Sequence, residues 1–169
     1  MKLEQLMTIG YEGSSPKDFL TTLTAAGVTT LLDIREFAGS RRRGFAKTAL
    51  RENLMSVDIA YRHEPDLGSP RDIRHRLREN GNYEQFFRDF DRYLNTQQNL
   101  LKQLTEELSG HIALLCYERD YRECHRKSVA AAFNQLTGLN PKHLGVQPHD
   151  AVQARAYARA HPGQSLPAA

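Results

Sequence analysis

The stretch CYERDYRECHR, residues 116–126, combines residue types that catalyse reactions or bind ligands in many proteins. It holds the two cysteines of the chain, Cys116 and Cys124, and His125 and Arg126 follow the second cysteine directly. A thiol beside a histidine and an arginine indicates nucleophilic catalysis, because neighbouring cations stabilise the reactive thiolate. Packing, metal binding and redox chemistry are the alternatives that the rest of the chain must distinguish.

Cys124 is the stronger candidate for a nucleophile. We expect it in the first turn of a helix, where the partial positive charge of free amide groups favours a thiolate. The same amides bind phosphate or carboxylate groups, so one pocket would hold an anion and present a thiolate to it. The alternative role is that of a small apolar side chain. For Cys116, inside the apolar run IALLC, this structural role is favoured.

The spacing of these residues argues against metal and redox chemistry. Cys116, Cys124 and His125 are three possible zinc ligands, but structural zinc sites commonly use cysteine pairs about two to four residues apart. Neighbouring residues of a helical turn point apart, so we expect Cys124 and His125 to diverge and the chain to hold no metal or other cofactor. A redox pair would require the loop to fold Cys116 back beside Cys124.

Upstream residues complete a candidate anion site. Asp33 and Arg35 lie two positions apart on a predicted strand, so both side chains face one side of the sheet. In the functional interpretation, Asp33 orients Arg35 or a histidine and Arg35 binds an anion. In the structural interpretation, the two form an ion pair that orders the following loop. The candidate catalytic residues are Cys124, His125, Glu118 and Asp33, and the candidate anion-binding residues are Gly10, Tyr11, Arg35, Ser40, Arg41 and Arg126.

The chain carries 17 arginines but only 6 lysines. Its net charge of +3 is too small to indicate a nucleic-acid-binding protein by itself. Arginine is the better indication, because its guanidinium fork binds phosphate and carboxylate oxygens bidentately. Residues 41–43 are three arginines in a glycine-flanked loop, where anion binding is favoured. The arginines of residues 71–78 are interspersed with acids, and a solvated surface explains them equally well.

The elements that must position these residues follow from apolar periodicity. Apolar runs that end at turn residues predict strands over residues 6–10, 28–36, 59–64, 111–118 and 141–146. Helical spacing predicts helices over residues 14–27, 46–58, 82–108 and 124–136, the third of them either continuous or broken near Asn95 and Thr96. This alternation predicts a single α/β domain with a mostly parallel sheet of about five strands and helices on both faces. The strand order is not predicted.

The candidate residues converge on one edge of this sheet. Gly10 ends the first predicted strand, Asp33 and Arg35 lie at the end of the second, and Cys116 and Glu118 end the fourth. Open α/β sheets bind ligands at the carboxyl ends of their strands. The convergence therefore supports a functional site there more strongly than any single motif does.

Length and composition are those of one globular domain. The 169 residues predict an α/β domain over 1–146 and a peripheral helix with a C-terminal tail over 147–169. The first residues lack the apolar core of a secretory signal, and no run approaches the roughly 20 apolar residues of a membrane span. With only two cysteines, we expect a cytoplasmic protein with reduced thiols and no membrane partner.

The motifs TIGYEG, DIREFAGSRRRGF, IAYRHEPDLG, LLCYERDYRECHR and KHLGV occur in the order typical of DUF488, a bacterial and archaeal domain of unknown function. The chain resembles this family from about Thr8 to Val146, although Tyr11 and Glu12 replace the usual His-Ser after the opening glycine. The resemblance implies a single α/β domain and no established reaction. It marks Asp33, Arg35, Ser40, Arg41, Cys116, Glu118, Cys124, His125 and Arg126.

Three functions are compatible with these residues. The first hypothesis is an enzyme that acts on a phosphate-bearing small molecule or a nucleic acid, with Cys124 as nucleophile or thiol donor and arginines binding the anion. The second is a non-catalytic module that binds a nucleotide or nucleic acid through the same arginines, and the third is a cysteine redox sensor. Fast alkylation of Cys124 near neutral pH is expected of the enzyme and the sensor, but not of the module. The oligomeric state is not predicted.

Overall fold

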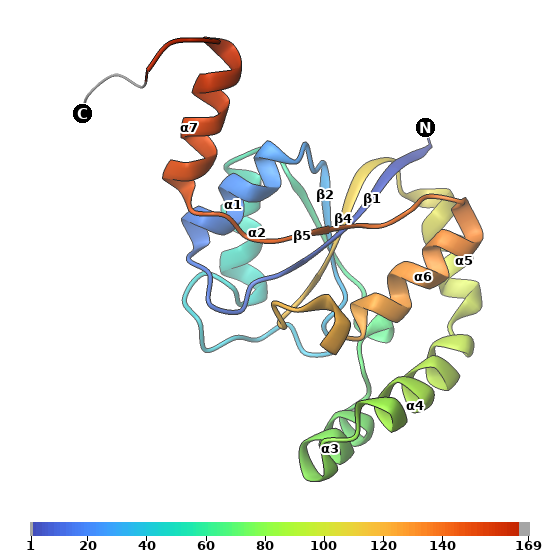
Figure 1. Ribbon diagram of the computed structural model, residues 1–169. Helices are drawn as coiled ribbons and strands as arrows, with labels where there is room; N and C mark the ends of the chain where they lie inside the picture. Colours follow the sequence, from blue (N-terminus) through green and yellow to red (C-terminus); the bar gives the residue numbers. More distant parts are fainter. Residues whose placement is uncertain (1, 166–169) are drawn as a thin grey trace.

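The computed structural model describes residues 2–165 and contains a five-stranded sheet with helices on both faces (Figure 1). The strands are β1 (Leu3–Gly10), β2 (Thr30–Asp33), β3 (Ala60–His63), β4 (Gly110–Cys116) and β5 (Lys142–Leu144). They lie in the order β3-β2-β4-β1-β5, and every neighbouring pair is parallel. The predicted single α/β domain with a mostly parallel sheet is confirmed.

Seven helices connect and flank the strands in the described part of the chain. They are α1 (Pro16–Ala25), α2 (Lys47–Met55), α3 (Arg71–Asn80), α4 (Tyr83–Asn95), α5 (Gln98–Glu107), α6 (Arg126–Thr137) and α7 (His149–Ala160), with two 3-10 turns, η1 (Pro65–Leu67) and η2 (Tyr121–Glu123). Local sequence explains several boundaries. Ser15 caps α1 by accepting a hydrogen bond from the amide of Asp18, and Gly81 and Gly138 end α3 and α6 in left-handed conformation.

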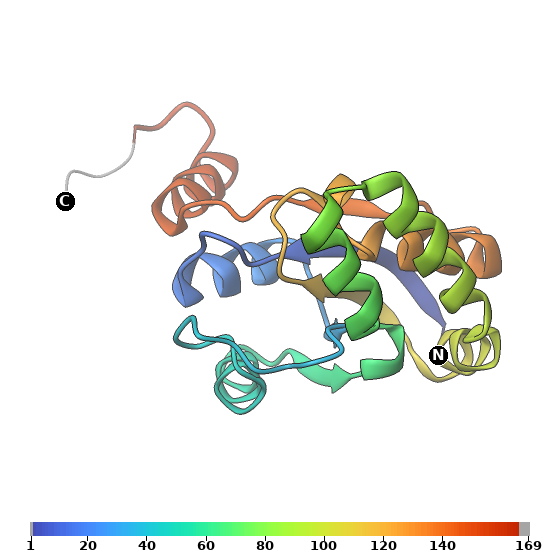
Figure 2. The same ribbon diagram turned by 90° about the horizontal axis from the view of Figure 1, so that it is seen from below.

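The sheet separates two hydrophobic cores, because successive side chains of a strand point to opposite faces. In β4, Ile112 and Leu114 pack into the core formed with α4, α5 and α6. Ala113 and Leu115 pack into the core formed with α1 and α2 on the other face. Figure 2 shows these two helical layers on either side of the sheet. The prediction of helices on both faces is therefore confirmed.

Helix α3 was not predicted from the sequence, and the structure decides between the two alternatives for the helix over residues 82–108. Helix α3 buries only Ile73 and packs on α4 rather than on the sheet, so its arginine-rich sequence lacks the apolar stripe of a core helix. The predicted helix over residues 82–108 is broken near Asn95, as one alternative had it, and forms α4 and α5. The predicted strand over 59–64 ends at His63, because η1 begins at Pro65.

The C-terminal helix α7 lies on α1, away from the sheet (Figure 1). Thr21 Oγ1 lies 2.7 Å from His149 Nδ1, and the amide of His149 donates to Asp18 Oδ1. Residues 166–169 of the predicted tail lie outside the described residues. Within residues 2–165, no helix combines the length and the apolar character that a membrane crossing requires.

Replacing Leu114 with alanine should strongly destabilise the protein. Leu114 is wholly buried in β4, the middle strand of the sheet, and its truncation should lower the free energy of unfolding by about 2–5 kcal/mol. Leu136→Ala is the control, because Leu136 on α6 is 38% exposed and its loss should cost at most about 0.5 kcal/mol. Urea unfolding of both variants measures the difference. Equal midpoints would contradict the position of β4 in the core.

Candidate active site

The carboxyl ends of β1, β2 and β4 lie at one edge of the sheet, as predicted, and the strand order places them side by side. Gly10 of β1 pairs with Cys116 of β4, and Asp33 of β2 pairs with Leu115 of β4. The loops that follow these strands therefore start from one edge of the sheet. They carry most of the residues that the sequence singles out for chemistry.

Cys116, Cys124 and His125 form a buried cluster at the end of β4. Nδ1 of His125 lies 3.5 Å from Cys116 Sγ and 3.9 Å from Cys124 Sγ, and the three ligand-type atoms all lie within 4.8 Å of one another. The expectation that Cys124 and His125 diverge is therefore wrong. The loop does fold Cys116 back beside Cys124, which is the condition that a redox pair requires. The same three residues are also the ones that could hold a metal ion.

Cys124 does not lie in the first turn of a helix. Its backbone is extended, with φ −132° and ψ 142°, and α6 begins at Arg126. This conformation turns its side chain toward His125, and the first amide of α6 lies 3.5 Å from its Sγ. The position expected inside the first turn is thus corrected to one immediately before the helix.

The charges within the cluster favour a thiolate at Cys116, whereas Cys124 was the expected one. Burial alone would raise the pKa of Cys116, but hydrogen bonds from Cys124 and the nearby His125 lower it well below its usual value. Burial and the proximity of Cys116 raise the pKa of Cys124 well above its usual value. Burial and the negative charge of Cys116 also raise the pKa of Glu118 to about 7.

The ring of His125 is held in one orientation. Its Nε2 lies 2.9 Å from the carbonyl oxygen of Ile34, so Nε2 carries the proton and Nδ1 faces the two sulfur atoms. Phe90 of α4 packs edge-on against the ring, with 5.3 Å between the centroids. Burial alone would lower the pKa of His125, but the charge of Cys116 and its hydrogen bond raise it.

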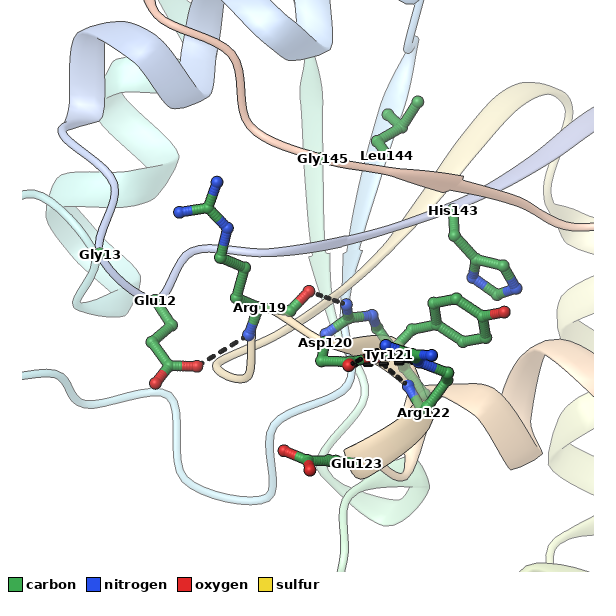
Figure 3. Close-up of a pocket in the computed structure, with 11 residues that line it drawn as sticks. Glu12, Gly13, Arg119, Asp120, Tyr121, Arg122, Glu123, His143, Leu144 and Gly145 are labelled. Carbon is green, nitrogen blue, oxygen red and sulfur yellow. Dashed lines mark hydrogen bonds and ion pairs between the residues drawn. The ribbon is translucent and has the colours of Figure 1, made fainter.

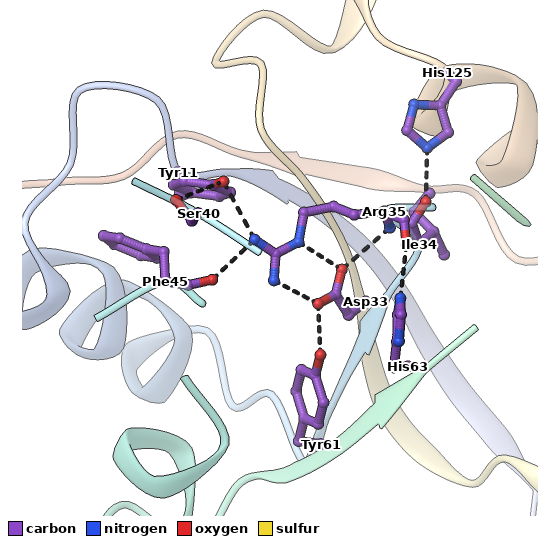
Figure 4. Close-up of polar contacts among 9 residues, drawn as sticks. All are labelled: Tyr11, Asp33, Ile34, Arg35, Ser40, Phe45, Tyr61, His63 and His125. Atoms are coloured by element: carbon purple, nitrogen blue, oxygen red, sulfur yellow. Dashed lines mark hydrogen bonds and ion pairs between the residues drawn. The ribbon is translucent and has the colours of Figure 1, made fainter. Parts of the chain in front are cut away.

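Asp33 and Arg35 form a buried ion pair (Figure 4). The guanidinium donates from Nε to Asp33 Oδ1 at 2.9 Å and from Nη2 to Oδ2 at 2.6 Å. Its Nη1 donates to the carbonyl oxygen of Phe45 and to the hydroxyl of Tyr11, which in turn donates to Ser40 Oγ. Burial alone would lower the pKa of Arg35, but Asp33 raises it above its usual value. The pair holds the loop 36–46 on the sheet, which is the structural alternative considered for these residues.

Arg126 is also bonded within the protein. Its side chain is 1% exposed and donates to Thr8 Oγ1 and to the carbonyl oxygens of Glu118 and Arg119. Gly10 allows this arrangement, because a Cβ there would lie 1.8 Å from the Glu118 carbonyl oxygen. Gly10 and the Arg126 side chain therefore fix the backbone that presents Glu118, and the guanidinium of Arg126 forms no hydrogen bond with either cysteine in the described part of the chain.

Two adjoining cavities of about 280 and 270 Å³ lie against the cysteine cluster, and we call them together the reaction cavity. Both are lined by Ser69, Arg74, Arg78, Glu118 and His125, and Cys116, Tyr11 and Arg35 also line the second. The sequence did not single out Ser69. Arg74 and Arg78 belong to a run that could equally be a solvated surface, but their spacing of four places them on one face of a helix. That spacing is the sequence feature that could have identified Arg74 and Arg78 as neighbours in a binding site.

Ser69 is buried but has an unused hydrogen-bonding group. The residue is 2% exposed, and no group in the described part of the chain forms a hydrogen bond with its Oγ. Buried polar atoms in folded proteins are nearly always paired, so an unpaired hydroxyl in a residue that lines a cavity marks a candidate ligand contact, although protein atoms cover the oxygen itself. Arg74 donates to the Ser69 carbonyl oxygen.

A larger cavity of about 800 Å³ lies between the 119–123 segment and β5, next to Arg126 (Figure 3). Arg122 is paired there with Asp120, and the ring of Tyr121 stacks on His143 with 3.5 Å between the centroids. Neither cysteine lines this cavity. We therefore place the candidate active site in the smaller reaction cavity, where the thiol, imidazole and carboxylate groups meet. Ser40 and the exposed Arg41 line none of these three cavities.

Asp33→Asn should destabilise the protein far more than loss of an exposed ion pair does. It leaves the Arg35 guanidinium, which is 6% exposed, without its counter-charge, at a cost of roughly 3–5 kcal/mol in unfolding free energy. The control is Asp89→Asn, which breaks the Arg76–Asp89 pair where Arg76 is 47% exposed and should cost at most about 1 kcal/mol. Thermal and urea unfolding report both values. A similar small loss in the two variants would show that Asp33 and Arg35 do not support the loop.

The chain was compared with known protein families, curated proteins and solved structures. Residues 15–133 match the family model described as "Domain of unknown function DUF488". No curated protein and no solved structure is detectably similar to the chain. The matched range contains the Asp33–Arg35 pair, the arginine loop and the whole cysteine cluster, whereas the TIGYEG and KHLGV motifs lie outside it. Because the match covers well over half of the sequence, the chain belongs to the DUF488 family.

Proposed function

We propose that this protein is an enzyme that acts on a phosphate-bearing substrate in the reaction cavity. One observation carries the proposal: Cys116, Glu118 and His125 line the same cavity as two arginines, Arg74 and Arg78. Anion-binding groups beside a thiol, an imidazole and a carboxylate form a constellation that both holds and transforms a ligand. Cys116 ends β4, Glu118 and His125 lie between β4 and α6, and both arginines lie on α3.

The arginines of α3 would bind the phosphate group. Arg78 is exposed, and within residues 2–165 the ion pairs of this helix form at Arg74, His75 and Arg76 rather than at Arg78. An unpaired guanidinium at a cavity offers a planar fork of donors to phosphate oxygens. The hydroxyl of Ser69 would contribute a further hydrogen bond from the floor of the cavity. The Arg35 and Arg126 side chains support this proposal by fixing the surrounding loops.

The cluster at the end of β4 would act on the bound group. Glu118 lies on the wall of both parts of the cavity, with its Oε2 3.1 Å from Cys116 Sγ. A carboxylate in this position can transfer a proton to or from a group bound beside it. Cys116 and His125 reach the cavity from the buried side, so a substrate atom that contacts Glu118 also lies near the sulfur and the ring.

A second candidate function, a non-catalytic module that binds nucleic acid, is favoured by the arginine loop. Arg41 and Arg43 are exposed, and Phe37 nearby in the loop is 76% exposed. Exposed aromatic rings beside arginines bind single-stranded nucleic acid by stacking and by phosphate contacts. Binding of this kind would fall steeply with salt and depend on residues 41–43. It would not depend on the reaction cavity.

Arg78→Ala should weaken binding of inorganic pyrophosphate. Loss of a hydrogen bond to a charged group costs about 1.5–3 kcal/mol, which is a decrease of about 10- to 150-fold in affinity. Arg71→Ala is the matched control, because Arg71 begins the same helix, is exposed and lies outside the lining of the cavity. Isothermal titration calorimetry of the full chain measures both. Equal effects of the two substitutions would mean that net charge, not the cavity, determines the affinity.

Ser69→Ala should weaken pyrophosphate binding without lowering the free energy of unfolding. Removing a buried hydroxyl that lacks a partner should leave the free energy of unfolding unchanged or raise it by up to about 3 kcal/mol. The same variant should bind pyrophosphate about 2- to 10-fold more weakly, because a hydrogen bond to the ligand is lost. Ser56→Ala, on an exposed serine at the end of α2, is the control for both measurements. Undiminished pyrophosphate affinity in Ser69→Ala would remove Ser69 from the site.

A further inference from the structure

We propose that Cys116, Cys124 and His125 bind a zinc ion and that the fourth coordination position faces the reaction cavity at Glu118. Zinc binding stands on the geometry of the three residues alone, and only the use of the metal in a reaction rests on the proposed function. The site would add a metal to a cluster that otherwise offers only side-chain groups.

The separations between the ligand atoms fit one tetrahedral ion. Zinc bonds of about 2.3 Å to sulfur and about 2.0–2.1 Å to nitrogen place the two ligand atoms roughly 3.6 Å apart at a tetrahedral angle. The observed separations are 3.5 Å from Cys116 Sγ to His125 Nδ1 and 3.9 Å from Cys124 Sγ to the same nitrogen. With all three atoms within 4.8 Å of one another, small side-chain rotations would bring them to coordination distance.

The histidine has the environment of a metal ligand. A ligating imidazole commonly donates its other ring N–H to a carbonyl or carboxylate oxygen, which fixes the tautomer and the direction of the lone pair. His125 Nε2 meets the Ile34 carbonyl oxygen at 2.9 Å, and Phe90 packs against the ring. Nδ1 therefore faces the two sulfur atoms, and zinc binding would displace any proton held there.

The ionisable groups of the cluster favour a cation at this point. Cys116, Cys124 and His125 are 4%, 1% and 6% exposed, and a carboxylate oxygen of Glu118 lies 3.1 Å from Cys116 Sγ. Two thiolates and a carboxylate in so small a buried volume would carry negative charge that a dication neutralises. The combination of thiolate and imidazole selects zinc over magnesium or calcium, which prefer oxygen ligands.

The fourth zinc coordination position faces the reaction cavity because Glu118 is the partly exposed neighbour of the three buried ligands. Glu118 is half-buried and lines both parts of the reaction cavity, whereas Cys124 lines neither. Three buried protein ligands with a fourth position open to a cavity are the arrangement of catalytic rather than structural zinc sites. When bound, such an ion would supply Lewis-acid chemistry to an oxygen of the phosphate-bearing substrate. Arg78 and Ser69 would orient that substrate.

The expectation of no metal rested on the long spacing between the cysteines and on a helical turn at Cys124, and the chain does not form that turn. The extended backbone of Cys124 follows the 3-10 turn η2, and this short turn returns the chain to the end of β4 where Cys116 lies. The seven residues between the cysteines therefore form a closed loop that brings the two thiols together. The spacing of the cysteines in the sequence nevertheless differs from that of a paired zinc motif.

The test is the metal content of the full chain, expressed with added zinc and freed of loosely bound metal by gel filtration. We expect about one zinc per chain by elemental analysis. Replacement with Co²⁺ should give the near-ultraviolet absorption of cobalt–thiolate bonds and the visible bands of a tetrahedral site, a readout that needs no variant. Cys124→Ser and His125→Gln should lower the zinc content to below about one-tenth of that of the unmodified chain, because each removes a ligand.

Glu118→Gln and His143→Gln are the controls. His143 lies in the larger cavity beside Tyr121, so its replacement should leave the zinc content unchanged. Glu118→Gln should keep the zinc, because the three buried ligands remain, and should change the visible cobalt spectrum. The zinc proposal is overturned by a metal-free chain without cobalt–thiolate absorption, whether its thiols are free or joined in a Cys116–Cys124 disulfide. If such a metal-free chain binds pyrophosphate and loses that binding on Arg78→Ala, the proposed function is still supported. If the chain binds zinc but not pyrophosphate, only the metal site is supported.

Discussion

Asp33 and Arg35 form a buried ion pair at the end of β2, and the organisation of the carboxyl edge depends on it. The pair, with the Tyr11 hydroxyl and the Phe45 carbonyl oxygen, ties the start and the end of loop 36–46 to the sheet. Two charges so well buried are stable only when their hydrogen bonds are nearly all made, which leaves little freedom for the backbone beside them. The site is therefore built on a rigid polar network rather than on a mobile loop.

This rigidity extends to the cysteine cluster through one backbone segment. The carbonyl oxygen of Ile34 accepts from His125, and the carbonyl oxygen of Arg35 lies 2.7 Å from His63 Nε2 (Figure 4). The orientation of the catalytic candidate His125 is thus fixed by Ile34, the residue between the two members of the ion pair. Arg126 fixes the opposite side through the carbonyl oxygens of Glu118 and Arg119. Buried arginines here fix the backbone around the cluster, and Arg78 of α3, which forms no ion pair within residues 2–165, is the arginine proposed to bind a ligand.

The sequence predicted the elements with regular signals and missed those defined by tertiary contacts. The apolar strands and the capped helix after Ser15 follow from local patterns, and so does the convergence of polar residues on one edge. Helix α3 has a single buried side chain, so no periodic pattern marks it. The meeting of Cys116 with Cys124 depends on the turn η2 and an extended residue, which no periodicity specifies. Ser69 has no distinctive neighbours in sequence, and only the folded chain shows that its hydroxyl lacks a partner and that the residue lines the cavity.

An anionic substrate is expected to bind beside the cysteine cluster. A crystal structure of the full chain with tungstate, a tetrahedral phosphate analogue located by its anomalous scattering, tests this binding most directly. We expect an anomalous peak in the reaction cavity, within reach of Ser69, Arg78 and Glu118. Tungstate bound instead in the larger cavity beside His143, or along the loop of Arg41–Arg43 with the reaction cavity empty, would contradict it.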